Sequence, residues 1–327
     1  SGDISIRFSR KVVIVSFILS VFVMYIHAKN LAYYDFGDVQ GTFIYGLNQI
    51  MSETLGRIAV PFFFLQSGYW MFRYDIFDTK SDILRRKLKK KVISLGIPYL
   101  IWNTFGLLFF IIMTHISGIL FGLYSGQDIS ISLSNVVEGI ILHKFYLPFW
   151  FMQDLIVLTV LSMLGINTPV CQTSSILLFT IGGALSAYHR EYWEKPNGSH
   201  FETAFYIILF LILAVIKWLS IPFFYTIYIV LSPILFWKSC ELLGELNLFD
   251  HEPLWFCKQS FFIYSAHIFP VEGLSSILSR VSGSMAWASF SYIVTPLVAL
   301  GLLYVVARIL AHTFPKVYRV LCGGRNS

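Results

Sequence analysis

The chain has 327 residues, of which 56% are hydrophobic and only 13% are charged. Soluble domains carry about 25% charged residues, so this composition excludes an ordinary cytosolic enzyme, a disordered chain and a secreted disulfide scaffold. The mean hydropathy of +0.70 predicts an integral membrane protein with several spans. The net charge of +6 is concentrated before an apolar run, which is typical of a cytoplasmic membrane anchor and not of a nucleic-acid interface.

Several apolar runs approach the roughly 20 residues that a membrane-spanning helix needs. They cover residues 11–27, 41–72, 92–114, 147–165, 173–188, 202–219, 221–239, 255–271 and 287–312. The run at 41–72 contains Pro61 and is interrupted near residues 53–57, so we expect it to cross once as a broken helix. The runs are too long and continuous for barrel strands, and lipid leaves only helices and closed barrels. The predicted fold is therefore an all-α transmembrane bundle.

Lysine and arginine set the predicted orientation of the spans. The N-terminus is basic and the segment 73–91 is the most basic of the chain, so we place both in the cytoplasm. The loop 115–146 is then outside, with an amphipathic piece around residues 133–142. Nine crossings would leave the basic C-terminus outside, so we expect a tenth span between residues 218 and 285 and a cytoplasmic C-terminus. We treat residues 1–327 as one domain in the inner (plasma) membrane.

The chain lacks the motifs of soluble enzymes, including the P-loop, G-x-S-x-G and H-E-x-x-H. Its four cysteines are too far apart in sequence for a zinc or redox pair, and we interpret them as small apolar fillers. Any chemistry must therefore come from polar side chains on membrane helices, and we predict no metal.

Two ionisable residues are predicted at similar depth on neighbouring spans. His27 lies about 24 Å along a helix from Lys11, and Arg57 lies about 22 Å from Phe72, at roughly 1.5 Å per residue. A histidine suits proton transfer near neutral pH, and an arginine suits an oxyanion or a developing negative charge. The alternatives are an interfacial anchor for His27 and a structural salt bridge from Arg57 to Glu53.

Further polar residues occur in later runs. Trp150, Gln153 and Asp154 open the run at 147–165, where Trp150 could be an aromatic-belt anchor and Asp154 could pair with Arg57 or orient His27. His267 could be a core histidine or a catalytic one. Weaker candidates, all polar and all inside apolar runs, are Gln66, Ser67 and Asn103.

Five segments together resemble the integral membrane acyltransferase family 3. They are the first span ending in His27, RIAVPFFFLQSGYWMF (57–72), the basic block followed by IPYLIWN (97–103), FWFMQDLIVL (149–158) and SFFIYSAH (260–267). The resemblance implies about ten helices, and transfer of an acyl group, often acetyl, from cytosolic acyl-CoA to an acceptor beyond the membrane. Such acceptors are commonly sugars of surface polysaccharides, lipopolysaccharide or peptidoglycan.

The resemblance also implies roles for individual residues. His27 matches the family's essential first-helix histidine, Arg57 a second-helix arginine and Trp150 the aromatic of the Trp-Phe segment. Two positions depart from the pattern, because Ser16 and Gln153 stand where many members carry arginines.

The sequence leads to one main hypothesis and one alternative. The catalytic candidates are His27, Arg57, Asp154 and His267. The candidates for substrate binding are Trp150, Gln153, Gln66, Ser67 and Asn103. Acetyl-CoA as acyl donor would dock near Arg73, Arg85, Arg86 and Lys87, a basic block that could also simply anchor the chain beside anionic lipid. The acceptor would be a hydroxyl of an extracytoplasmic glycan, and the alternative is a transport-like membrane domain without acyl transfer.

Overall fold

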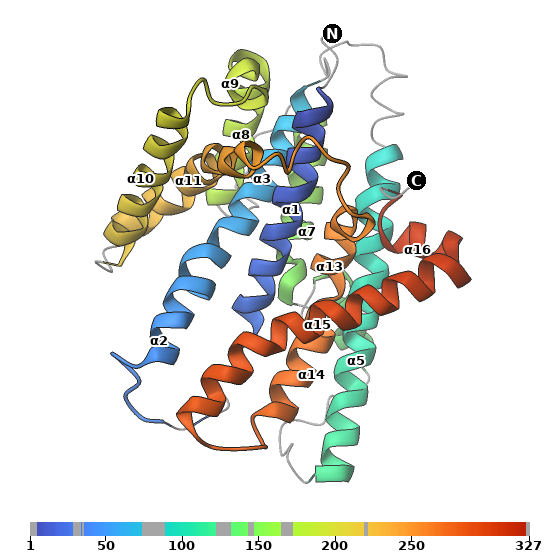
Figure 1. Cartoon of the computed structure of the whole chain (residues 1–327). Coiled ribbons are helices and arrows are strands. Elements are labelled where there is room, and N and C mark those ends of the chain that lie inside the picture. Colours follow the sequence, from blue (N-terminus) through green and yellow to red (C-terminus); the bar gives the residue numbers. More distant parts are fainter. Residues whose placement is uncertain are drawn as a thin grey trace. The chain divides into compact units, whose positions relative to one another are not determined.

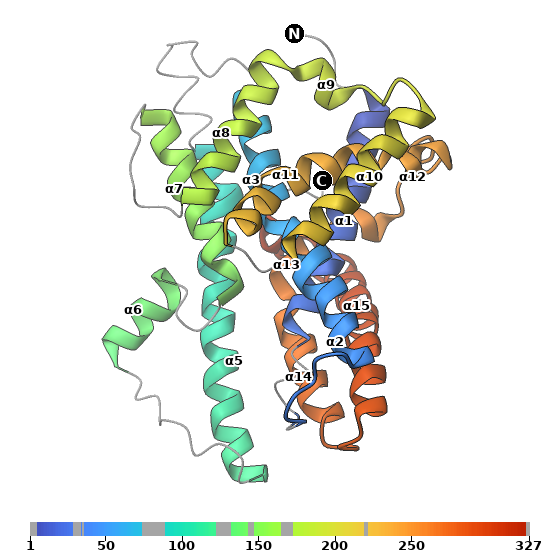
Figure 2. The same cartoon turned by 90° about the vertical axis from the view of Figure 1, so that its left-hand side faces the viewer.

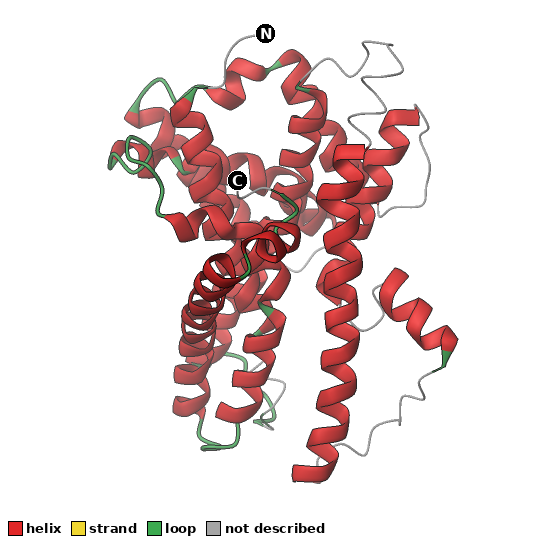
Figure 3. Ribbon diagram, turned by 90° about the vertical axis from the view of Figure 1, so that its right-hand side faces the viewer, coloured by secondary structure: helices red, strands yellow, loops and turns green. Residues whose placement is uncertain are grey.

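The computed structural model describes residues 5–28, 34, 36–73, 89–121, 132–142, 147–164, 173–218 and 222–324. Throughout these residues the regular secondary structure is helical and contains no strand, which confirms the predicted all-α class (Figure 3). The helices of Figure 1 are α1 (Ile6–His27), α2 (Phe43–Asn48), α3 (Arg57–Phe72), α5 (Ile97–Phe121), α6 (Leu133–Ile141), α7 (Trp150–Leu164), α8 (Thr173–Tyr188), α9 (Arg190–Glu194), α10 (His200–Lys217), α11 (Pro222–Ser239), α12 (Glu241–Glu245), α13 (Ser260–Ala266), α14 (Ile268–Leu278), α15 (Met285–Thr313) and α16 (Pro315–Leu321). Shorter π- and 3₁₀-helical segments are η2 (Gln49–Gly56), η3 (Val92–Gly96), η4 (Leu147–Phe149) and η5 (Trp255–Gln259).

The contacts divide the chain into two compact units. The first comprises Ser1–Asp78 and Pro169–Val305, and the second comprises Thr79–Thr168 and Val306–Ser327. In the first unit α1 packs against η2, α3, α13 and α14. In the second unit α5 packs against α6 and α16, and the indole of Trp102 donates to the carbonyl of Leu321, 3.1 Å away.

Five helices in the described part of the chain are long and apolar enough to cross a membrane. They are Ile6–His27, Lys89–Ile112, His200–Lys217, Pro222–Glu245 and Met285–Thr313. The pair Trp255–Ala266 and Ile268–Leu278, bent by 68°, adds a sixth if it counts as one span. The chain is therefore a multi-span membrane protein, while ten spans and the orientation of both termini stay predictions.

One contact corrects the order of crossings expected from the sequence. Arg73 follows α3, Glu194 ends α9 just beyond α8, and their side chains form an ion pair of 2.8 Å. The ends of α3 and α8 therefore lie on the same side of the first unit (Figure 2). One crossing for each of the three runs at 92–114, 147–165 and 173–188 would put them on opposite sides. The described helices α7 and α8 have 15 and 16 residues, fewer than the roughly 20 of a full span, so these runs need not all cross.

The predicted interruption of the 41–72 run is a π-helix and not a gap. Residues Phe43–Phe72 are helical without a break, and η2 lies immediately before α3. Pro61 in the first turns of α3 has no N–H for the helical ladder, and a π-helical segment frees further carbonyls from regular pairing. Side chains fill this deficit, because Tyr228 donates to the carbonyl of Thr54 at 2.8 Å and Lys217 to that of Glu53.

Helices α3 and α8 approach so closely that only glycine fits at two positions. A Cβ on Gly68 would collide with the backbone of Phe179, and a Cβ on Gly182 with the backbone of Leu65. Small residues at membrane helix contacts allow such backbone approach. The structure therefore gives the Gln66-Ser67-Gly68 segment a packing role through its glycine.

Candidate active site

The C-terminal end of α1 meets the junction of α13 and α14 at two histidines. His27 is the last residue of α1, and His267 lies between α13 and α14. Their ring centroids are 5.0 Å apart and the planes are inclined by 54°. His27 is half-buried and His267 is completely buried. Two residues that are 240 positions apart in the sequence thus form one imidazole pair within the first unit.

The surroundings of His267 decide which of its nitrogens carries the proton. Its Nδ1 lies 2.6 Å from the carbonyl oxygen of Tyr264. Because a carbonyl only accepts, Nδ1 must donate, and in the neutral ring Nε2 then carries the lone pair. That Nε2 is buried and has no hydrogen-bond partner among the described residues. His267 therefore offers a buried acceptor nitrogen on a ring that lies beside His27.

A hydrogen-bond network fixes the last turns of α1. The hydroxyl of Ser52 donates to the carbonyl of Tyr25 at 2.6 Å and lies 2.6 Å from the hydroxyl of Tyr292. Ile26 also lies against Gly56, where a Cβ would come within 2.5 Å of its side chain. The residues directly before His27 are thus held by η2 and α15, which fixes where the His27 ring can lie.

Arg57 begins α3, next to the Gly56 that touches the last turn of α1. Its guanidinium donates to both carboxylate oxygens of Glu53, through Nε at 3.3 Å and an Nη at 3.0 Å. The side chains of Arg57 and Glu53 are 39% and 33% exposed. The structure therefore contains the salt bridge that the sequence offered as the structural alternative for Arg57, in an accessible place close in the fold to the end of α1.

The remaining candidates of the first unit have packing partners. The buried Gln66 accepts from the indole of Trp193 at 3.3 Å, while its amide nitrogen has no partner in the described part of the chain. Ser67 is half-buried. Neither residue is brought into the histidine pair by a contact in the described structure.

The second unit holds the other substrate-binding candidates. Trp150, Gln153 and Asp154 lie on α7 and are half-buried, each with interactions of its own. Asn103 on α5 is completely buried. Neither its amide nitrogen nor its amide oxygen forms a hydrogen bond to another described residue. The predicted pairing of Asp154 with Arg57 or His27 stays a prediction.

Four residues were predicted to bind the acyl donor, and the structure describes one of them, Arg73. Arg73 is buried and bound to Glu194, which also accepts from Tyr69. Burial lowers the pKa of Arg73, but Glu194 outweighs that effect and the net shift is upward, so this arginine stays charged. Arg85, Arg86 and Lys87 lie outside the described residues.

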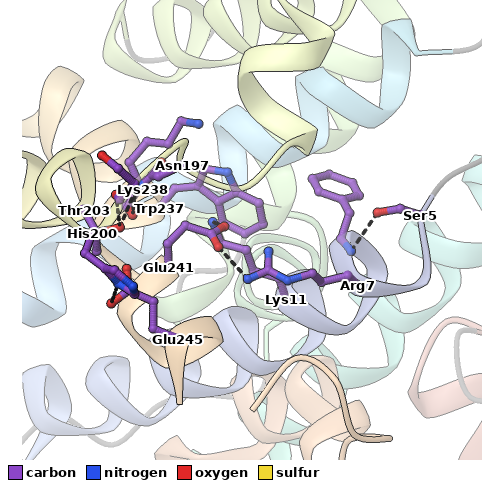
Figure 4. Close-up of polar contacts among 12 residues, drawn as sticks. Ser5, Arg7, Lys11, Asn197, His200, Thr203, Trp237, Lys238, Glu241 and Glu245 are labelled. Atoms are coloured by element: carbon purple, nitrogen blue, oxygen red, sulfur yellow. Dashed lines mark hydrogen bonds and ion pairs between the residues drawn. The ribbon is translucent and has the colours of Figure 1, made fainter. Parts of the chain in front are cut away.

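Sequence reasoning missed a charged cluster at the opposite end of α1. Lys11 and Glu241, both almost fully buried, form an ion pair of 2.5 Å, and Arg7 joins the same carboxylate at 2.8 Å (Figure 4). The ammonium of Lys11 also lies 3.9 Å from the centre of the Trp237 ring. The available signal was a glutamate just after an apolar run together with the basic start of α1. No group of three or more metal-ligating side chains occurs in the described structure.

The comparison with protein families agrees with the residues on which the site is built. Residues 17–168 match a family model described as an acyltransferase domain. The model is that of acyltransferase family 3, and the match covers 152 of the 327 residues. The acyltransferase match includes His27, Arg57, Asn103, Trp150 and Asp154, whereas His267 lies beyond its end. No curated protein and no solved structure matched the chain.

Proposed function

We propose that the protein is a membrane-embedded acyltransferase of the inner membrane. It moves an acyl group, with acetyl as the first expectation, from cytosolic acyl-CoA to a hydroxyl of an extracytoplasmic glycan or a similar acceptor. The observation that carries this proposal is the imidazole pair of His27 and His267 at the end of a helix from a membrane acyltransferase domain. Acyl transfer to a hydroxyl needs a group that removes its proton, and histidine has the appropriate pKa for that role.

We assign separate roles to the two rings. The carbonyl of Tyr264 keeps the proton of His267 on Nδ1, so that Nε2 can accept a hydrogen bond from a ring N–H of His27. The other His27 nitrogen then presents its lone pair to the acceptor hydroxyl, as an orienting partner does in catalytic triads. His27 accepts the hydroxyl proton while the hydroxyl oxygen attacks the thioester carbonyl. The C–S bond breaks, and His27 returns the proton to the departing thiolate.

Arg57 supports the negative charge that develops on the thioester oxygen. Its salt bridge to Glu53 uses Nε and one Nη, and the guanidinium has five N–H donors, so donors remain for a substrate oxygen. Loss of one such donor typically costs about 2.7–4 kcal/mol of transition-state stabilisation. Glu53 holds the guanidinium on the α2–η2–α3 helix beside the end of α1.

The position of the pair fits a reaction with substrates on two sides of a membrane. Donor and acceptor are separated by a hydrocarbon layer of roughly 30 Å. Arg73 and the basic N-terminus lie toward the end of the first unit where α1 begins, and His27 lies at the other end of α1. The donor would enter from the basic end, with its pantetheine chain extending along α1 toward His27.

The test is transfer of radiolabelled acetyl from acetyl-CoA in proteoliposomes of the full chain, with the label followed into the glycan and lipid fractions. We expect His27→Ala to abolish transfer while thermal unfolding is unchanged. Lys195→Met is a matched control, because among the described residues the exposed Lys195 forms its ion pair with the exposed Glu191 alone. Full transfer by His27→Ala would refute the mechanism, and uptake of an acceptor without acetyl-CoA would favour the transport alternative.

A further inference from the structure

A serine of η2 joins the two elements that carry the proposed catalytic groups. Ser52 is only 3% exposed and lies in η2, one position before Glu53. Its hydroxyl donates to the carbonyl of Tyr25 at 2.6 Å, two residues before His27 at the end of α1. Glu53 in turn binds the guanidinium of Arg57. One side chain therefore connects the turn that carries the histidine with the helix that carries the arginine.

The hydroxyl of Tyr292 fixes the direction of this contact. Tyr292 lies on α15, is completely buried, and has its hydroxyl oxygen 2.6 Å from that of Ser52. A serine hydroxyl has one proton, and Ser52 gives that proton to the carbonyl of Tyr25, so Tyr292 must donate to the Ser52 oxygen. The two bonds run in one direction, from Tyr292 through Ser52 to Tyr25, and hydrogen bonds in such a chain strengthen each other.

The end of α1 needs an external donor at this carbonyl. Carbonyls in the last turn of a helix have no partner within the helix, and α1 ends at His27. Ser52 supplies the missing partner for Tyr25. The rings of Tyr25 and Tyr292 also pack edge to face, with their centroids 5.7 Å apart. The Ser52–Tyr292 pair thus caps the turn from which His27 projects.

Close packing one turn further along η2 holds the two helices together. Gly56 lies four residues after Ser52, and a Cβ there would come within 2.5 Å of the Ile26 side chain. Gly56 allows the close approach to α1 but makes no directional contact. The hydrogen bond of Ser52 has a preferred angle and length, so it defines how η2 is aligned with the end of α1.

We propose that Ser52 and Tyr292 are positioning residues, which hold His27 and Arg57 at the spacing that acyl transfer requires. Reacting groups must be held in a narrow geometry, and a misplacement of about 1 Å can cost on the order of 100-fold in rate. Both residues are buried and act through the helices that they join. The role in acyl transfer rests on the proposed function, whereas the hold on the His27 ring can be measured without turnover.

The first arm of the experiment follows His27 itself, in the full chain in nanodiscs. The hydrogen on Cε1 of a histidine exchanges slowly with deuterium, at a rate that depends on the access of water to the ring and on its protonation. The tryptic peptide 12–29 contains His27 as its one histidine, and the peptide 239–258 contains the exposed His251 as an internal reference. Mass spectrometry of the two peptides gives both exchange rates in one sample.

The variants remove one hydroxyl at a time. We expect Ser52→Ala and Tyr292→Phe to speed the exchange of His27 at least threefold, because the end of α1 loses its cap, while His251 is unchanged. Ser52→Thr keeps a hydroxyl and should lie closer to the wild type than Ser52→Ala. The matched control is Ser289→Ala, which removes a hydroxyl bonded within α15 and should leave both rates unchanged.

The second arm measures kcat and KM for acetyl transfer in proteoliposomes, together with thermal unfolding. Ser52→Ala and Tyr292→Phe should lower kcat about 10–100-fold, while KM for acetyl-CoA stays within twofold. Because Tyr292 acts through Ser52, the double variant should lose no more than Ser52→Ala alone. A purely structural role predicts a lower unfolding temperature with unchanged exchange of His27 and unchanged kcat.

Two results would overturn the positioning role, namely unchanged exchange of His27 in both single variants and additive losses of kcat in the double variant. If Ser52→Ala does not fold, Tyr292→Phe decides alone, because it keeps the ring and removes one hydroxyl. A wild type that transfers no acetyl group, with faster exchange of His27 in the variants, would refute the proposed function and leave the hold on His27 standing.

Discussion

Two substitutions of His267 separate the roles of its ring nitrogens. The amide nitrogen of an asparagine falls near the position of Nδ1, so His267→Asn can keep the 2.6 Å hydrogen bond to the carbonyl of Tyr264. It removes Nε2, which has no other partner among the described residues. The amide oxygen of a glutamine falls near the position of Nε2, so His267→Gln keeps an acceptor beside His27 and loses the other contact.

The expected magnitude follows from what a positioned base contributes. Proton transfer by a side chain supplies about 10²–10⁴-fold in rate, and each tenfold step is about 1.36 kcal/mol. In the proposed mechanism, His267 orients the base and does not take the hydroxyl proton itself. We therefore expect His267→Asn to lower kcat about 100-fold, or about 2.7 kcal/mol, and His267→Gln to lower it less than about 10-fold.

The assay is acetyl transfer in proteoliposomes, with kcat and KM measured separately for each single variant and for both combined with His27→Ala. Residues that act as one unit are strongly non-additive, so His267→Asn should cost nothing further once His27 is absent. A purely structural role predicts equal losses in the two His267 variants and a parallel loss of thermal stability. Equal activity of His267→Asn and wild type would refute the assignment.

Three further predictions concern packing and charge. Glu241→Gln should destabilise the protein by about 3–5 kcal/mol, because it leaves Lys11 buried without its carboxylate; adding Lys11→Met should restore much of that loss in thermal unfolding. Gly182→Val should prevent α8 from reaching the backbone of Leu65, seen as loss of monodisperse protein on size exclusion, and normal elution would contradict it. Tyr228→Phe removes one hydrogen bond to η2 and should lower the free energy of unfolding by about 1 kcal/mol. If its acetyl-transfer activity stays within twofold of the wild type, this bond does not position the site.

The sequence by itself determined the fold class and identified several of the residues that form the candidate site. A charged fraction of 13% cannot cover a soluble surface, and continuous apolar runs in lipid must be helices. The place of the interruption before Pro61 was also readable, because proline removes a donor from the helical ladder. His27 and His267 were each visible as costly polar groups inside apolar runs.

The tertiary structure decided which of these groups meet. Nothing in the local sequence indicates that residues 27 and 267 share one contact, since that depends on the packing of α1 against α13 and α14. The contact of Arg73 with Glu194 likewise corrected the order of crossings expected after α3, because hydropathy records the length of a run and not the direction in which it packs. Lys11 and Lys238 look alike as basic residues at the ends of apolar runs. Only the fold gives one of them a carboxylate and the other an aromatic ring.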